Sequence, residues 1–171
     1  AAEAALLRAQ AADGRWSAAA TDDDEAATGL ALLALLAERP QALASPPVAR
    51  AVADATRWLR ARQADDGGFG RGARSERGHA LATEALLEVW AQTGDPGLRH
   101  ALVPAVRRLA TDAHGTPVGD ATEWTRRALA RAHGLGWRTP ADAPTTTSSS
   151  WALPGAPQAS QCARVLAFIA Q

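Results

Sequence analysis

The sequence contains no lysine, no methionine and no tyrosine, and its only cysteine is Cys162. A single thiol excludes an internal disulfide and a zinc site built from several thiolates. The 18 arginines balance 18 acidic residues, so the formal net charge is zero and no basic field is available to attract nucleic acid or anionic lipid. The longest apolar run, residues 29–37, has roughly half the length that a membrane-spanning helix needs. We therefore expect no nucleic-acid partner and no transmembrane segment.

Alanine and leucine at helical spacing dominate what the chain does contain, and 47% of its residues are hydrophobic. The sequence predicts a first short helix that ends at Gln10 and then helices over residues 26–38, 46–63, 79–92, 97–111 and 121–133. Acidic residues or prolines mark the expected helix starts, and Gly or Pro marks the expected ends. No segment has the pattern of a strand, so we expect an all-α fold. Residues 139–160 are rich in Pro, Thr and Ser and predict a linker, followed by a short last helix over 161–170. The expected division is a helical domain over 1–138 and a tail over 139–171.

Two turns of the chain carry the same short motif, in which a helix end is followed by a glutamine, an acidic turn, a glycine and an aromatic residue. The motif residues are Gln10, Gly14 and Trp16 in the first copy and Gln63, Gly67 and Phe69 in the second. A third unit, residues 98–109 and 121–133, has lost the glutamine and the aromatic residue from its turn. We expect the glycine to permit a tight backbone, the aromatic ring to pack on the helix pair and the amide to bond free carbonyls at the helix end.

The pattern Leu-x3-Gln-x3-Gly-x-Trp/Phe resembles the QW motif of the terpenoid cyclase and protein prenyltransferase superfamily, the α/α-toroids built from the prenyltransferase/squalene oxidase repeat. The stretch from Gly78 to Pro96, followed by Asp120 and Trp124, looks most like exported bacterial repeat proteins of this superfamily that have no known catalysis. The resemblance implies a toroid-like array of about three helical hairpins. Such toroids close with five or six hairpins, so we expect an open or incomplete ring here.

The acidic run at residues 22–25 is the sharpest candidate for chemistry. By position it resembles the Asp-x-Asp-Asp motif of class II terpenoid cyclases, which implies Asp24 as a general acid with Asp22 and Glu25 beside it. Such an acid would have to be kept protonated by burial and neighbouring carboxylates. Glu25 and Ala26 depart from that motif, and the simpler interpretation is a helix cap with acids exposed to solvent. We expect the cap.

Other candidate residues carry weaker signals. The four histidines and Cys162 show no tight ligand spacing, so we expect no metal and no cofactor. Trp90 and Trp124 lie on helices that would line the inside of a toroid, where they would either stack an apolar ligand or pack in the core. The arginines between Arg57 and Arg77 either bind an acidic partner or form a solvated face paired with local acids.

Three functions remain open from the sequence. An open array leaves terminal faces uncovered, which favours a non-catalytic interaction or scaffold subunit with a protein partner or a second copy. The alternatives are a module that binds an apolar or isoprenoid ligand and a fragment of a class II cyclase-like enzyme. The apolar segment 165–169 should dock on the open repeat or on a neighbouring subunit. The chain begins Ala1-Ala2-Glu3, which fits removal of an export signal, proteolysis or trimming of the chain. An exported or periplasmic location is favoured over a cytoplasmic one.

Overall fold

The computed structural model describes residues 2–17, 23–37, 41–70, 75–114 and 120–139. These residues form the helices α1 (Ala2–Ala9), α2 (Asp24–Ala37), α3 (Pro46–Arg62), α4 (Ser75–Thr93), α5 (Pro96–His114) and α6 (Asp120–Gly134). A short 3-10 helix, η1 (Ala42–Ala44), precedes α3, and the described residues contain no strand. The all-α prediction is therefore confirmed. Each described helix matches an expected one, although α4 begins at Ser75 rather than at His79 and η1 was not predicted.

Proline and aspartate mark the starts of three helices. Pro46 is the first residue of α3 and Pro96 the first residue of α5. A missing N–H costs nothing there, because the first-turn amides of a helix have no intrahelical acceptor. Asp23 caps α2, since its Oδ1 accepts the backbone N–H of Ala26 at 3.0 Å. These starts are local consequences of the sequence.

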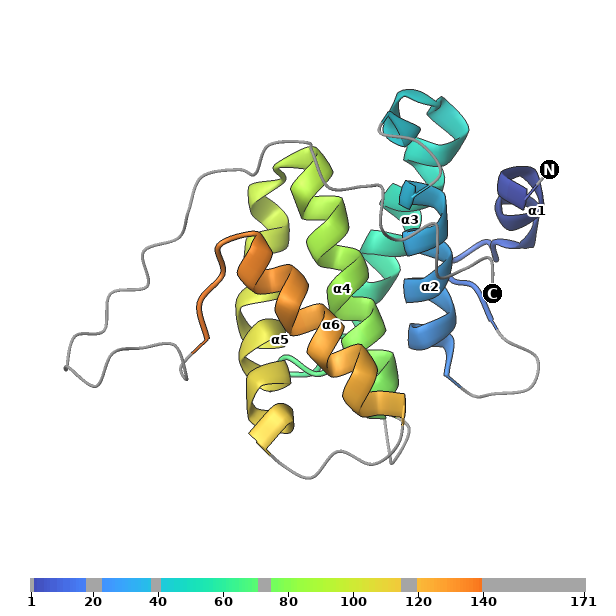
Figure 1. The fold of residues 1–171 in the computed structure, drawn as a ribbon. Coiled ribbons are helices and arrows are strands. Elements are labelled where there is room, and N and C mark those ends of the chain that lie inside the picture. The colour runs from blue at the N-terminus through green and yellow to red at the C-terminus, as the bar shows by residue number, and fades with distance from the viewer. Residues whose placement is uncertain (1, 18–22, 38–40, 71–74, 115–119, 140–171) are drawn as a thin grey trace.

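The helices pack in two layers (Figure 1). In one layer α2, α4 and α6 lie side by side, and the middle helix, α4, makes its most extensive contacts with these two neighbours. In the other layer α5 packs on α4 and α6, α3 packs on α2, α4 and η1, and α1 lies at the edge against α2 and α3. Two ion pairs, Glu84–Arg127 and Glu88–Arg131, join residues with the same separation of 43, so α4 and α6 run parallel.

The core follows from this arrangement, because the central helix is enclosed on all sides. Residues 78–87 of α4 are all buried. The largest fully buried side chains are leucines contributed by four helices together with one valine and one aromatic residue: Leu32, Leu35, Leu36, Val48, Leu59, Phe69, Leu81, Leu86, Leu87, Leu98, Leu102 and Leu109. Burying a leucine of this kind stabilises the fold by about 1.5–3 kcal/mol.

Several predictions concern residues outside the described ranges. They include Asp22, Cys162, the linker after residue 139 and the last helix over 161–170. The open, toroid-like arrangement of about three hairpins also stays a prediction. Among the described residues no helix is both long enough and apolar enough to cross a membrane.

Candidate functional site

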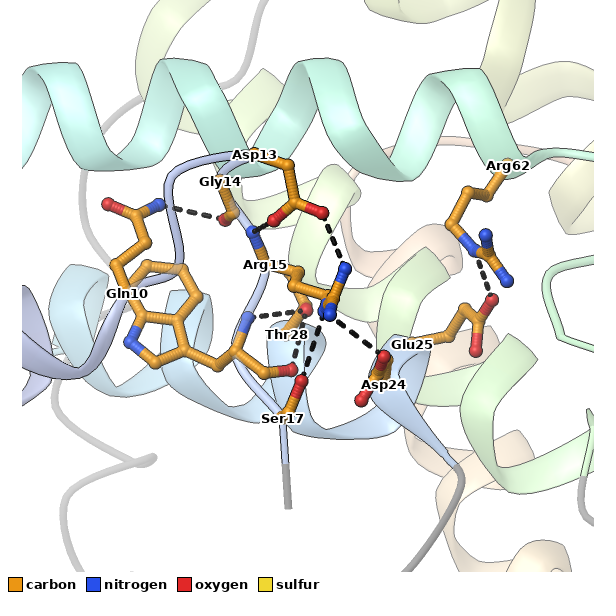
Figure 2. A network of polar contacts seen from close by, with 10 residues as sticks. Gln10, Asp13, Gly14, Arg15, Ser17, Asp24, Glu25, Thr28 and Arg62 are labelled. Carbon is orange, nitrogen blue, oxygen red and sulfur yellow. Dashed lines mark hydrogen bonds and ion pairs between the residues drawn. The ribbon is translucent and has the colours of Figure 1, made fainter. Parts of the chain in front are cut away.

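The two motif glutamines make the same pair of hydrogen bonds. Gln10 Nε2 donates to the carbonyl oxygens of Gly14 (2.8 Å) and Ala51 (2.9 Å). Gln63 Nε2 donates to the carbonyl oxygens of Gly67 (3.0 Å) and Ala101 (2.8 Å). The first bond of each pair closes the turn that follows the glutamine, as Figure 2 shows for Gln10, and the second reaches the next helix of the same layer, α3 or α5. One amide thus joins each turn to the following repeat.

The motif glycines are required by the turn and by its close approach to the next helix. Gly14 has a φ of +97° and Gly67 a φ of +85°, in the left-handed region that side chains disfavour. A Cβ on Gly14 would lie 2.6 Å from the carbonyl carbon of Asp54, and a Cβ on Gly67 would lie 2.5 Å from that of Pro104. Only glycine lets the turn and the helix backbone come this close.

The aromatic residue of each turn is anchored to the other layer. Trp16 is buried, its backbone N–H donates to Thr28 Oγ1 (3.1 Å), and the Thr28 hydroxyl donates back to the Trp16 carbonyl (3.2 Å). The N–H of buried Phe69 donates to Nδ1 of His79 on α4 (3.3 Å). Each motif therefore links three helices, and Thr28 and His79 complete it although neither was expected to take part. Both lie some ten residues beyond their turn, so no local pattern marks them.

The acids at the start of α2 are less exposed than expected. Asp23, which caps the helix, has only 8% of its surface exposed, and Glu25 has 5%. The cap interpretation is correct for Asp23, but the expectation of solvent-exposed acids is wrong for both residues. The reason is tertiary: the start of α2 meets the start of α4, where a Cβ on Gly78 would lie 2.5 Å from Asp23 Oδ1. Asp24 is partly exposed, with a side-chain accessibility of 32%.

Asp24 and Glu25, at the start of α2, each pair with an arginine (Figure 2). Arg15 Nε lies 3.3 Å from Asp24 Oδ2 and 3.1 Å from Ser17 Oγ, while its Nη1 lies 2.5 Å from Asp13 Oδ2. Arg62 Nε donates to Glu25 Oε1 at 2.7 Å, and its guanidinium lies 5.0 Å from the centroid of the Trp58 ring. These contacts connect the first motif turn and the end of α3 to the start of α2. Their chemistry is that of paired carboxylates with a structural role.

A second charged cluster, between α4 and α6, was missed from the sequence. Arg127 Nη2 lies 3.3 Å from Glu84 Oε1, and Arg131 Nη2 lies 2.6 Å from Glu88 Oε2. Burial raises the pKa of Glu84, and Arg127 opposes that shift. Glu84 and Glu88 are spaced i,i+4, as are Arg127 and Arg131, but sequence spacing cannot tell which two helices will face each other.

The two tryptophans proposed to bind a ligand do not lie together. Trp90 is buried and meets the ring of Trp137 edge-on, with centroids 5.3 Å apart. Trp124 is half-buried, and the guanidinium of Arg127 lies 4.9 Å from its ring centroid. Given the 43-residue offset between α4 and α6, Trp124 lies level with Leu81, about 13 Å along the helix axis from Trp90 at 1.5 Å per residue. One small ring could not stack on both.

The histidines are dispersed. His79 is buried in the second motif, and His100 and His133 are exposed on α5 and α6. Within the described residues no group of three or more His, Cys, Asp or Glu side chains is placed to hold a metal ion. The side chains of His114 and Cys162 lie outside the described set.

Comparisons with protein-family models, with curated proteins and with solved structures found no match for this chain. Membership of the α/α-toroid superfamily therefore stays a prediction based on the motif.

Proposed function

We propose that this chain is a non-catalytic helical-repeat subunit that binds a protein partner or a second copy in a larger assembly. The observation that carries the proposal is the N-terminal edge of the array, which we define as α1 together with the half-exposed stripe Ala27, Leu30 and Ala34 of α2. None of the eight residues of α1 is buried. Apart from Glu3 and Arg8 the edge consists of alanines and leucines that are exposed or partly exposed, as in a surface to which a further helix could add.

The orientation of the stripe supports this proposal. Gly29 of α2 lies against the backbone of Leu81 in α4. At 100° per residue, Ala27, Leu30 and Ala34 fall roughly 100–160° around α2 from Gly29, on the side away from α4. In stacked helical repeats each unit buries its apolar face on a neighbour, so a half-exposed apolar stripe is where another unit or a partner would add.

The order of the helices supports the toroid-like part of the proposal. One layer holds α2, α4 and α6 and the other holds α1, α3 and α5, with each motif turn joining successive helices of the second layer. We propose that the three hairpins form an open arc of such a toroid, with residues 139–171 as a separate docking tail.

The pairing of the acids favours the interaction role over a cyclase-like reaction. An ion pair is a contact of the deprotonated carboxylate, whereas protonation of an alkene requires the neutral acid. Asp24 lies beside Arg15, and Glu25 lies beside Arg62. The separation of Trp90 from Trp124 likewise supports the interaction role over the apolar-ligand alternative, in which both rings would contact one ligand.

Association of the native chain tests the proposal. Tagged protein, isolated from the cells that naturally produce it, is expected to sediment as an oligomer or as a stoichiometric complex identified by mass spectrometry. Ala34→Glu places a charge on the edge and should abolish that association, while Ala61→Glu, on an exposed position of α3, should not. Melting curves of both variants control for folding. A monodisperse monomer that co-purifies with nothing would show the proposal to be wrong.

A further inference from the structure

A groove lies between α1 and α3, beside the first motif turn. It is lined by Leu7, Gln10, Pro46, Pro47, Arg50, Ala51 and Asp54 and has a volume of about 400 Å³. That volume falls within the range of sites for small ligands or short chain segments. One side of the groove is formed by α1, which belongs to the N-terminal edge defined above.

The groove combines apolar side chains with the amide of Gln10. Leu7 of α1 and Pro46 and Pro47 of α3 all line the groove, and the two prolines have no N–H to satisfy. Both N–H groups of the Gln10 amide are used by Gly14 and Ala51. Its Oε1 therefore remains as an acceptor at the groove, suited to a backbone N–H of an extended peptide.

The charge of the groove favours an acidic occupant. Asp54, the only acid among the lining residues, is already paired with Arg57 at 2.5 Å. Arg50 is exposed and has no ion pair with any described residue. Helix α3 as a whole carries four arginines against one aspartate. Arg57 pairs with Asp54 and Arg62 pairs with Glu25 of α2, which leaves Arg50 and Arg60 without an ion pair to a described residue. A carboxylate can form a bidentate contact with such an arginine.

The corresponding junction between α3 and α5 differs in chemistry. The equivalent bonds from Gln10 to Ala51 and from Gln63 to Ala101 align Arg50 with His100 and Asp54 with Pro104. There Asp66 in the second turn forms an ion pair with Arg108 of α5. In the first turn Asp13 pairs instead with Arg15, within the same turn, and no such bridge to α3 is formed. The first junction alone combines an unpaired arginine with prolines and a leucine.

We propose that the groove between α1 and α3 binds an acidic, extended segment of a protein partner, with an apolar side chain between Leu7 and the two prolines and a carboxylate on Arg50. This inference rests on the proposed interaction function and names its partner's chemistry. The chain's own tail fits less well, because residues 140–171 contain one acid, Asp142, and one arginine, Arg164.

A defined peptide tests the groove on the full chain. The probe is a blocked, fluorescein-labelled heptapeptide of alternating Glu and Leu, titrated by fluorescence polarisation. Arg50→Glu should weaken binding by about tenfold or more, because an attractive charge becomes repulsive. His100→Glu places the same acid at the aligned position of α5 and should leave the affinity within about twofold. Peptides of alternating Lys and Leu or Glu and Ser should bind weakly, and the Leu7 methyl resonances should shift only with the Glu-Leu peptide.

The contrary outcomes are distinct. No saturable binding, equal weakening by both variants, or equal binding of the Glu-Ser peptide would overturn the proposal. A change in the sedimentation of Arg50→Glu without peptide would also overturn it, because that change would identify a second copy as the occupant. A shift of the NMR signals from residues 165–169 in the same variant would identify the tail as the occupant and would overturn it too. If the chain associates with its partner but does not bind the peptide, only the groove proposal is wrong. If the chain is a monomer that co-purifies with nothing, the proposed function is wrong instead.

Discussion

Replacing the motif glutamines by leucine separates the energetic roles of two geometrically equivalent turns. Gln63→Leu removes both hydrogen bonds of that amide, to Gly67 within the turn and to Ala101 in α5. Gln10→Leu removes the matching bonds to Gly14 and Ala51. The chemical change and the lost contacts are the same, so any difference in stability comes from what each turn connects.

The magnitude follows from the number of bonds and from the packing around them. Each intramolecular hydrogen bond contributes about 0.5–1.5 kcal/mol net, so the loss of two predicts a cost of about 1–3 kcal/mol. At Gln63 this cost should lower the global free energy of unfolding, because the turn joins α3 to α5 and both helices carry fully buried side chains. At Gln10 the turn joins α1, which has no buried residue, so α1 can detach while the rest stays folded.

Urea unfolding combined with amide hydrogen exchange measures both effects. Gln63→Leu should shift the unfolding midpoint to lower urea by an amount equivalent to about 1–3 kcal/mol. Gln10→Leu should change the global free energy by less than about 0.5 kcal/mol but accelerate exchange of the Gly14 N–H, which donates to Ala11 in the turn. Equal global losses in the two variants, or no loss at Gln63, would refute the view that the amide joins neighbouring repeats.

Three further predictions concern single residues. Gly67→Ala should destabilise the fold by at least about 1–3 kcal/mol, because it adds a clash with the Pro104 backbone to the strain of a positive φ. Gly134→Ala, whose added Cβ would meet nothing within 4 Å, should be close to neutral in the same calorimetric comparison. Asp23→Ala should lower stability by about 0.5–2 kcal/mol through loss of the α2 cap, measured by thermal melting; an equal loss in Asp24→Asn would contradict the assignment of the cap to Asp23. Glu84→Gln should remove a pH-dependent loss of stability, seen as a melting-temperature difference, variant minus wild type, that rises from about pH 4.5 toward neutrality. A difference independent of pH would contradict the burial of the Glu84 charge.

The sign of the Glu84 prediction follows from proton linkage. Burial raises the folded-state pKa of this carboxyl above the unfolded value. As the pH rises through the unfolded pKa, the unfolded chain releases its proton before the folded chain does, so the free energy of unfolding falls until the pH passes the folded pKa. The groups facing Glu84 are Arg127 and Arg131, which limit the shift, and Glu88, which adds to it. Glutamine has no proton to release, and so the variant lacks this fall.

The sequence by itself determined the helices and the repeated turn. Alanine and leucine at helical spacing, prolines at the starts of α3 and α5 and an aspartate ahead of α2 are local signals, and each acts within a few residues of where it lies. The spacing of Gln10, Gly14 and Trp16 could be recognised because the same arrangement recurs at Gln63, Gly67 and Phe69. Local geometry depends on neighbouring residues, and neighbours are visible in a sequence.

Only the tertiary structure decided which charges are buried and which pairs form. Asp23 and Glu25 look like solvated acids until α4 and Arg62 are placed against them, and Glu84 meets Arg127 only because α4 and α6 run parallel. The groove beside Arg50 likewise forms where α1 and α3 come together. The first turn there pairs Asp13 with Arg15 within itself, whereas Asp66 of the second turn pairs with Arg108 of α5. The burial of Asp23, Glu25 and Glu84 depends on residues far away in the sequence, 55 positions for Asp23 and Gly78, 37 for Glu25 and Arg62 and 43 for Glu84 and Arg127. The free energy of a charge is set by the groups that the fold brings beside it.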